Sequence, residues 1–496
     1  MTNQTDRGPT TEDIAAEIQQ RPQVYLQLTE NALTVAESLR DNYFRNTAKF
    51  ISHLRQAAHL AEQGERDSPI FEIHDATGAS WDEVQQEVVT FIDGGVGEVE
   101  MASQVPILLR VGSYAVKTGE RNLSEREQFG YYPVILGDLE GGSKGRKDYI
   151  DIVRITAELL GGLSALRRQP NLRMLMFHGP LVYLVGNYAG HTPFTENDID
   201  VFLRNYANDE QEGEELKEEF LEEARVHVYP EIVEGMATEL AERRLFEPVS
   251  WICFLYRKLI EEAKERDPTP IIAGVVERGN LREFSERIIL DRVFQGLREN
   301  EREDYFNEMY GRDDLNTESA LLDRLGYTDP LLLSMLLEPG EYSEPWTVGK
   351  YGGLRGGEVT LNWESRETNF DWNYLRPPGP HSFPKVKGTY LSVNETTKPV
   401  RIEVFSDLGD DQIERAVRRT YLYASLLPGY GFPVGLDVVD KHAKVPDWLT
   451  GAYEKLIQHH LGVSLQSGEI EDSELRRILV QSIYMTNRDW IFRPES

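Results

Sequence analysis

Apolar and polar positions along the chain follow two different spacings. Through residues 10–66 the apolar side chains recur three and four positions apart, which predicts a helical arm ahead of the core. From residue 87 onward, compact β-rich runs alternate with helically spaced segments. In chain order we expect strands at 87–93, 105–116 and 128–136, a helix at about 149–166, a strand at 172–177, charged helices within 211–266, a strand at 270–276 and a charged helix around 280–299.

This order of elements predicts the fold class. Three successive strands form a meander, and strands that follow crossover helices can then lie parallel in the same sheet. The runs at 173–177 and 271–276 are largely apolar, as parallel strands covered on both faces require. We therefore expect an α/β protein with an RNase H-like mixed-sheet core, a helical N-terminal arm and helical insertions.

The second part of the chain predicts how that core is completed. Pro and Gly are frequent from about 300 to 384, a stretch that we expect to be irregular. Two strands at 388–393 and 400–405 are typical of a hairpin that adds to the sheet, and helices are expected at about 411–427, 447–461 and 472–484. We divide the chain into a helical arm at 1–84, a first core part at 85–300 with an acidic helical insertion at about 205–266, an irregular insertion at 301–384, and a C-terminal hairpin and helices at 385–496 that complete the core.

Composition and charge limit the classes of function. The chain has 496 residues, 40% of them hydrophobic, and is too long for one ordinary core. A net charge of −31 is unusual for a protein that grips phosphates, so any nucleic-acid contact must use a local basic channel, metal ions or a partner protein. The dense acidic block at 209–224 is typical of a solvated helix face.

The single cysteine and the lengths of the apolar runs exclude further classes. Cys253 alone cannot form an intrachain disulfide or a cysteine-based zinc cluster, and its apolar surroundings predict a buried, inert thiol. The N-terminus lacks the basic-then-apolar layout of a signal peptide. No apolar run approaches the roughly 20 residues needed to cross a bilayer. We expect a cytoplasmic protein without a membrane-spanning segment.

One carboxylate stands out in the first strand. Asp93 follows Phe91 and Ile92 and precedes Gly94 and Gly95, so we expect it at the carboxyl end of a buried strand. Two glycines would leave it little steric cover, and hard divalent cations require such oxygen ligands. The other interpretation is a turn aspartate that caps the strand exit, and the pattern alone favours that interpretation.

Glu158 and His178 are two further candidates. Glu158 shares a helical stripe with small residues, which would let its helix approach the sheet closely and point the carboxylate toward the strand ends. The alternative is an exposed pair with Arg154, four positions earlier. His178 ends the strand at 172–177, where a lone histidine is either a ligand or a structural residue.

Asp440 and His442 are the last candidates. They follow a turn-forming segment at 429–433 that would bring the chain back toward the core. Either residue could be a metal ligand, and either could equally lie on the surface. None of these motifs is specific by itself.

Taken in order, these segments resemble the NurA nuclease family over roughly residues 85–450. Members carry a strand that ends in Asp-Gly-Ser, which is similar to Asp93-Gly94-Gly95 here. They also carry a helical glutamate about 20 residues before a second strand-end Asp-Gly motif, and Glu158 holds that spacing to His178, which replaces the usual aspartate. The family's strand tyrosine, Val-Glu-like pair and C-terminal segment are similar to Tyr390, Glu403, and Gly431-Phe432-Pro433 with Leu436 and Asp440.

The resemblance implies a homodimeric nuclease that acts on DNA ends with Mn²⁺ or Mg²⁺, two ions being expected. It implies a HerA-type hexameric ATPase as partner, which pumps duplex toward the nuclease in end resection or phage defence. Two bridged metals would activate a water and stabilise the leaving oxygen. The implied metal ligands are Asp93, Glu158, His178 and Asp440, and Tyr390 is expected near the scissile phosphate.

The histidine at position 178 changes what the resemblance implies. A neutral imidazole binds Mn²⁺, whereas Mg²⁺ favours oxygen ligands, so we predict a nuclease that prefers Mn²⁺. The same departure leaves open a catalytically weakened assembly or regulatory subunit that caps an ATPase ring. A hydrolase of another phosphoester is a third alternative, although the sequence has no phosphate-cradling glycine loop.

Overall fold

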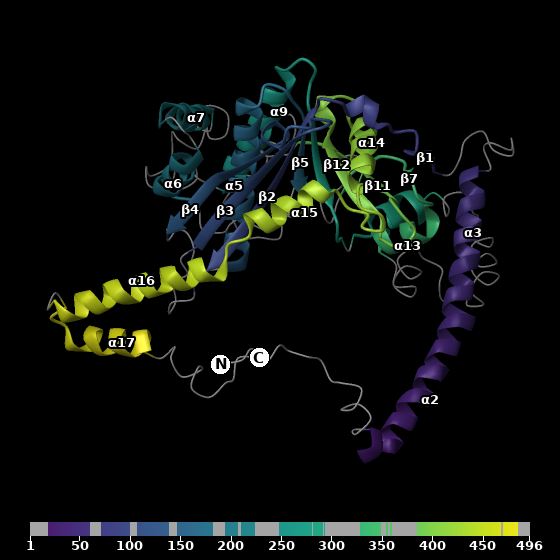
Figure 1. Ribbon diagram of the computed structural model, residues 1–496, viewed down its shortest axis with the longest axis horizontal. Helices are drawn as coiled ribbons and strands as arrows, with labels where there is room; N and C mark the ends of the chain where they lie inside the picture. Colours follow the sequence, from purple (N-terminus) through teal and green to yellow (C-terminus); the bar gives the residue numbers. More distant parts are fainter. Residues whose placement is uncertain are drawn as a thin grey trace. The chain divides into compact units, whose positions relative to one another are not determined.

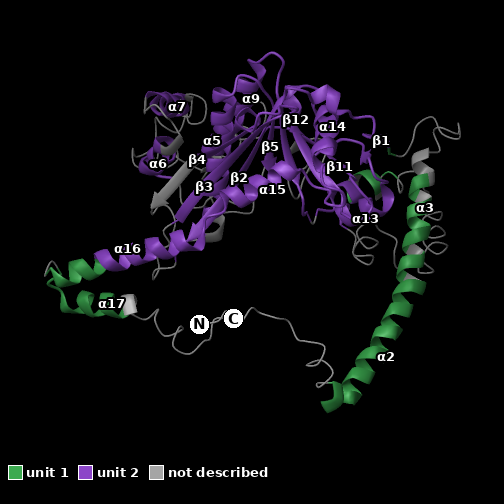
Figure 2. Ribbon diagram, viewed as in Figure 1, with its two compact units in different colours: residues 1–71, 286–327, 461–496 green, residues 72–285, 328–460 purple. Residues whose placement is uncertain are grey.

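The computed structural model divides into two compact units (Figures 1 and 2). One unit comprises residues 72–285 and 328–460, and the other comprises 1–71, 286–327 and 461–496. The four-segment division expected from the sequence stays a prediction. The structure describes residues 18–59, 71–99, 107–137, 146–181, 194–206, 210–223, 248–279, 281–290, 292, 328–348, 354–355, 358–359, 384–467 and 470–484.

A ten-stranded mixed sheet forms the centre of the larger unit. Its strand order is β1-β7-β11-β12-β6-β5-β2-β3-β4, and β8 pairs with β11. A separate two-stranded sheet consists of β9 (Leu354–Arg355) and β10 (Glu358–Val359). The strands of the main sheet are β1 (Ile73–Asp75), β2 (Val88–Glu98), β3 (Ile107–Lys117), β4 (Glu127–Gly137), β5 (Leu172–His178), β6 (Ile271–Val276), β7 (Glu341–Ser343), β8 (Trp346–Thr347), β11 (Val386–Leu391) and β12 (Val400–Phe405).

The predicted strand order is confirmed at the centre of this sheet. Strands β2, β3 and β4 form an antiparallel meander, and β5 lies parallel to both β2 and β6. The predicted hairpin is β11 and β12, which joins the sheet through an antiparallel pairing of β12 with β6. The mixed α/β class is therefore confirmed, and the order β4-β3-β2-β5-β6 is compatible with an RNase H-like core.

Helices cover both faces of the sheet and enclose two hydrophobic clusters. On one face, here called the α5 face, α5 (Arg146–Arg168) and α9 (Pro248–Lys264) pack with α6 (Glu196–Tyr206). On the other, the α15 face, α14 (Gln412–Ala424) and α15 (Val434–Ala443) pack on the central strands. Alternation of side chains along each strand sends Ile92 and Phe177 to the first face and Phe91 and Met176 to the second.

The predicted end of the first strand is wrong. Strand β2 continues to Glu98 along its ladder with β3, and only its parallel pairing with β5 ends at Ile92. Asp93 therefore lies inside β2, at the point where β5 stops beside it. The Gly-Gly pair after Asp93 does not turn the chain, because these glycines make room for neighbouring segments instead, as the site below shows.

Several elements were not expected from the sequence. Within the stretch predicted to be irregular, residues 329–347 contain the helix α13 (Asp329–Leu336) and the short strands β7 and β8. Strand β1 lies where the helical arm was expected. Strands of two or three residues are too short to show a period of two. Other short elements are η2 (Trp81–Val84), α4 (Leu123–Arg126), η5 (Ser285–Leu290) and η8 (Ser406–Leu408).

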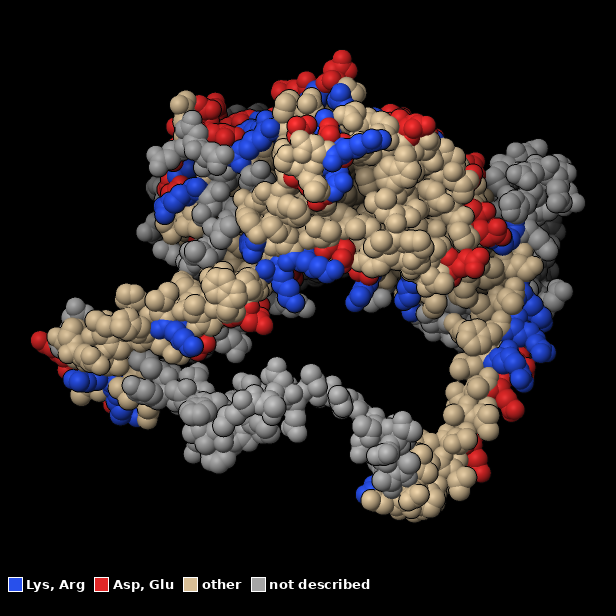
Figure 3. Space-filling view, viewed as in Figure 1, with Lys and Arg blue, Asp and Glu red and all other residues tan. Residues whose placement is uncertain are grey.

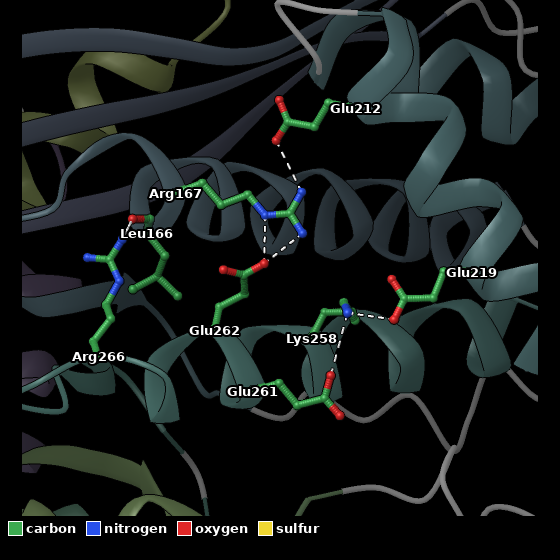
Figure 4. A network of polar contacts seen from close by, with 8 residues as sticks. All are labelled: Leu166, Arg167, Glu212, Glu219, Lys258, Glu261, Glu262 and Arg266. Atoms are coloured by element: carbon green, nitrogen blue, oxygen red, sulfur yellow. Dashed lines mark hydrogen bonds and ion pairs between the residues drawn. The ribbon is translucent and has the colours of Figure 1, made fainter.

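The acidic block is helical, as expected, but it is not only a solvated face. Helix α7 (Glu210–Glu223) is tied to the α5 face by ion pairs from two part-buried cations, as Figure 4 shows. Arg167 lies 3.1 Å from Glu212, and Lys258 lies 2.6 Å from Glu219. Cations of α5 and α9 therefore balance part of the negative charge of α7 locally.

The smaller unit is helical in its described residues. The expected arm is confirmed by α2 (Pro22–Ser38), the π-helical η1 (Leu39–Phe44) and α3 (Arg45–His59). Near the C-terminus lie α16 (Asp447–Gln466), which crosses from one unit into the other, and α17 (Ser473–Tyr484). Among the described helices, none has the length and apolar character needed to span a bilayer. Cys253 of the larger unit is buried, as predicted.

Candidate metal centre

Three of the predicted ligands come together on the α15 face. Asp93 of β2, His178 of β5 and Asp440 of α15 each offer a ligand atom, and these atoms all lie within 4.8 Å of one another. The Nδ1 of His178 lies 2.9 Å from Oδ2 of Asp93. The other oxygen of Asp93, Oδ1, accepts a hydrogen bond of 2.8 Å from the backbone N–H of Gly94. We call these three residues the metal group.

The strand register explains why two of them meet. Ile92 and Phe177 are partners in the parallel pairing of β2 with β5, so the next residues, Asp93 and His178, leave that pairing side by side. Both side chains follow the alternation to the α15 face. There the ring of His178 packs 5.4 Å from that of Phe432. Neighbouring parallel strands thus bring a carboxylate and an imidazole to one point.

The third member depends on a helix that the sequence did not reveal. Asp440 lies in α15, which crosses the sheet over β2, β3 and β5. The helix comes close because a Cβ on Gly95 would lie only 2.2 Å from the carbonyl oxygen of Ala443, and one on Gly112 would lie 3.1 Å from Val439. The glycine that suggested a strand exit therefore serves the docking of α15.

Glu158 lies close to the metal group but is not part of it. It is 3% exposed and projects from α5 on the opposite face of the sheet, behind Gly94. A Cβ on Gly94 would lie 2.6 Å from Oε1 of Glu158, so the absence of a side chain there is what admits the carboxylate. The pair with Arg154 is also present, at 3.5 Å, although Glu158 is buried rather than exposed.

The group concentrates negative charge. Burial and then the charge of Asp93 raise the pKa of the Asp440 carboxyl above its ordinary value. Burial lowers the pKa of His178, but its hydrogen bond to Asp93 and the charges of Asp93, Asp440 and Glu158 outweigh burial and raise it overall. The surroundings therefore favour a positive charge at this point, from a protonated imidazole or from a cation.

The donor set fits a divalent cation. Two carboxylates and one imidazole offer oxygen and nitrogen at a common point, which suits Mn²⁺ and, less well, Mg²⁺. Asp93 is buried, His178 is half-buried and Asp440 is exposed, so the group opens to solvent on the side of α15. Among the described residues no second group of this kind is found, and the second ion stays a prediction.

His442 was the alternative to Asp440, and it faces elsewhere. Its Nδ1 lies 3.3 Å from the hydroxyl of Tyr131, and its ring stacks on the Tyr131 ring at 4.2 Å. Burial and then the neighbouring Arg110 lower the pKa of His442. The structure thus brings Asp440, and not His442, to Asp93.

Tyr390 is not brought to the metal group. It is 1% exposed, its ring stacks on Trp346, and its hydroxyl donates to Oδ2 of Asp329 at 3.4 Å. Burial, chiefly, raises the pKa of Tyr390 well above its ordinary value. Its predicted place beside the scissile phosphate gains no supporting contact from the described residues.

Comparisons with known proteins identify the family of this chain. A family model described as the NurA domain matches residues 87–445. No curated protein matches the chain. Among solved structures, the chain is similar to the NurA nuclease from Sulfolobus solfataricus at 13% identity and a TM-score of 0.43, over 88% of this chain and 98% of that one.

Two other similar structures contain bound ligands. One is NurA with manganese, at 11% identity and a TM-score of 0.34, over 89% of this chain and 98% of that one. Another is NurA bound to dAMP and manganese, at 10% identity and a TM-score of 0.36, over 84% and 94% of the two chains. The NurA domain model spans most of the chain and includes all three residues of the metal group. The chain belongs to the NurA domain family.

Proposed function

We propose that this protein is a metal-dependent nuclease that hydrolyses phosphodiester bonds at DNA ends. The observation that carries the proposal is the metal group, Asp93, His178 and Asp440, whose ligand atoms converge within 4.8 Å inside the segment matched by the NurA domain. Other NurA proteins have been solved with manganese, in one case together with dAMP.

The side chains have different tasks in this proposal. Asp93 is held by Gly94 and His178, so one carboxylate is already oriented before an ion or DNA arrives. Asp440 lies on the open side of the group, where a cation can enter from solvent. A divalent cation held there would lower the pKa of a bound water and polarise the phosphate. Glu158 adds negative charge from behind Gly94, which favours cation binding.

The wider setting follows the family. We propose a homodimer that works with a HerA-type DNA-translocating ATPase in end resection or phage defence. A net charge of −31 supports a partner of this kind, because a nuclease would not need a basic surface of its own if an ATPase ring held the duplex.

One observation favours a second function. The Nδ1 of His178 lies 2.9 Å from Oδ2 of Asp93, so these two side chains can pair with each other without a metal. A catalytically weakened subunit that caps or regulates an ATPase ring would have such a site.

Cleavage of linear duplex DNA with Mn²⁺, with and without the ATPase, tests the proposal. We expect Asp93→Ala and Asp440→Ala to lose more activity than the about 10- to 100-fold typical of changes in residues that only support metal ligands. Asp437→Asn is the matched control, since Asp437 lies one turn before Asp440 on α15 and pairs with Lys441 at 2.6 Å. Full activity of Asp93→Ala would refute the assignment. No cleavage by wild type, together with a stable ATPase complex, would favour the capping subunit.

A further inference from the structure

A buried polar cluster lies on the α5 face, on the far side of the sheet from the metal group. Arg401 and Glu403 are neighbours on one face of β12 and are 3% and 1% exposed. The Nε of Arg401 lies 2.8 Å from Oε1 of Glu403. Burial of a carboxylate is costly unless it is paired, and removal of one partner would leave the other charge buried without compensation.

The second oxygen of Glu403 holds the turn that follows His178. The backbone N–H of Leu181 donates to Oε2 of Glu403 at 2.9 Å. Gly179, which lies between His178 and Leu181 in the chain, has φ +122°, a conformation that favours glycine. Its N–H donates to the carbonyl of Val275 at 2.9 Å. The chain therefore leaves β5 and folds immediately onto the α5 face.

Strand β6 lies between β5 and β12 in the sheet, and the turn after His178 passes over its Gly274. Gly274 stands opposite both Phe177 and Glu403 in the sheet. A Cβ there would lie 2.6 Å from the Leu181 nitrogen and 2.7 Å from the Gly179 oxygen. Only a bare backbone at this position allows the turn to reach the carboxylate of Glu403.

The far end of the cluster is anchored as well. Arg401 stands directly opposite Tyr390 in the pairing of β11 with β12. Tyr390 donates to Asp329, which also accepts backbone hydrogen bonds from Phe284 and Ser285 at 3.0 and 2.8 Å. Arg401 thus lies near the carboxyl groups of Glu403 and Asp329, and both of these accept hydrogen bonds from backbone N–H groups.

We propose that Glu403 is a positioning residue for His178. By holding the Leu181 N–H, it fixes the turn that begins one residue after His178 and so keeps the imidazole directed at Asp93. This inference deepens the proposed function, on which its consequence for metal binding and cleavage rests. It also gives Tyr390 a place in the site as an anchor of Arg401, without contact with substrate.

The positioning itself can be tested in metal-free protein. Glu403→Gln keeps the size of the side chain but leaves one acceptor oxygen where Leu181 and Arg401 now share two. The probe is ¹⁵N NMR of selectively labelled histidines, with the His178 signal assigned through His178→Gln. We expect Glu403→Gln to shift that signal toward the values of an imidazole without a carboxylate partner.

Thr118→Val is the matched control for lost stability. It removes a buried hydrogen bond of 2.8 Å to Tyr423 elsewhere in the same unit and should leave the His178 signal in place. An unchanged His178 signal in folded Glu403→Gln overturns the proposal, and so does the same shift in Thr118→Val.

Manganese binding supplies a second readout. Titration with Mn²⁺ followed by electron paramagnetic resonance should show about 10- to 100-fold weaker binding for Glu403→Gln and little change for Thr118→Val. If Glu403→Gln and wild type bind Mn²⁺ with equal affinity, Glu403 does not contribute to metal binding and that consequence of the proposal is contradicted. If wild type binds no Mn²⁺ while the NMR shift is still observed, the metal site fails and the positioning role stands.

Discussion

The residue at position 178 sets the charge of the metal group. An aspartate there would place three carboxylates within reach of one another, whereas His178 forms a hydrogen bond with Asp93. The imidazole can carry a positive charge in the absence of metal, and its pKa is raised accordingly. As a ligand it must lose that proton and offers nitrogen instead of oxygen.

A preference for Mn²⁺ is the expected consequence for wild type. Mg²⁺ favours oxygen ligands, so cleavage of linear duplex DNA should be faster with Mn²⁺ than with Mg²⁺ at equal concentration. His178→Asp restores a third carboxylate and should reduce the ratio of the two rates. The measurement is an initial-rate series with each ion. Equal wild-type rates with both ions would contradict this interpretation.

At the scale of elements, the position of α15 decides whether the third ligand arrives. The helix lies against backbone at Gly95, where a Cβ would meet the carbonyl of Ala443 at 2.2 Å. Backbone cannot move aside as the end of a flexible side chain can. The approach of the helix, and with it Asp440, is therefore sensitive to a single methyl group.

Gly95→Ala tests this docking. We expect it to lower the free energy of unfolding by about 1–3 kcal/mol, the usual cost of overpacking, and to weaken Mn²⁺ binding by displacing Asp440. Gly451→Ala is the matched control, because nothing lies within 4 Å of a Cβ at this position in α16. Gly451→Ala should raise the free energy of unfolding by about 0.5–1 kcal/mol, because alanine is more stable than glycine inside a helix. Denaturant unfolding and Mn²⁺ titration give both quantities, and equal behaviour of the two variants would refute the role of α15.

At the scale of the whole molecule, the negative charge opposes DNA. On the face shown in Figure 3, the described Lys and Arg side chains form small separate groups between acidic ones. Several of the cations are engaged within the protein, as in the pairs of Arg167 and Lys258 with acidic residues of α7. On this face the described residues offer phosphates no large basic patch, and a cation bound at the metal group would add positive charge there.

Removal of divalent cations should consequently weaken DNA binding as well as cleavage. We expect the Kd for a short duplex, measured by fluorescence anisotropy at low temperature before any cleavage, to rise about tenfold or more in EDTA, a loss of about 1.4 kcal/mol. For Asp93→Ala, addition of Mn²⁺ should lower the Kd for the duplex only slightly. A Kd that is the same in EDTA and in Mn²⁺ would show that the protein binds DNA without the ion.

The local spacing of apolar residues was sufficient to predict much of the core. The runs that became β3, β5, β6 and β12 were predicted within a few residues, because short continuous apolar, β-rich runs indicate buried strands without knowledge of their neighbours. The order of strands and crossover helix then brought Asp93 and His178 to neighbouring strands, since parallel strands need a crossover.

Only the tertiary structure decided the rest of the site. It placed Asp440 on a helix over the sheet, Glu158 behind a glycine on the opposite face, and Tyr390 in a buried cluster with Asp329. It also showed that the glycines after Asp93 admit neighbouring segments instead of ending a strand. These outcomes depend on which distant segments approach one another, and the contacts across a sheet or under a helix leave no period in the sequence.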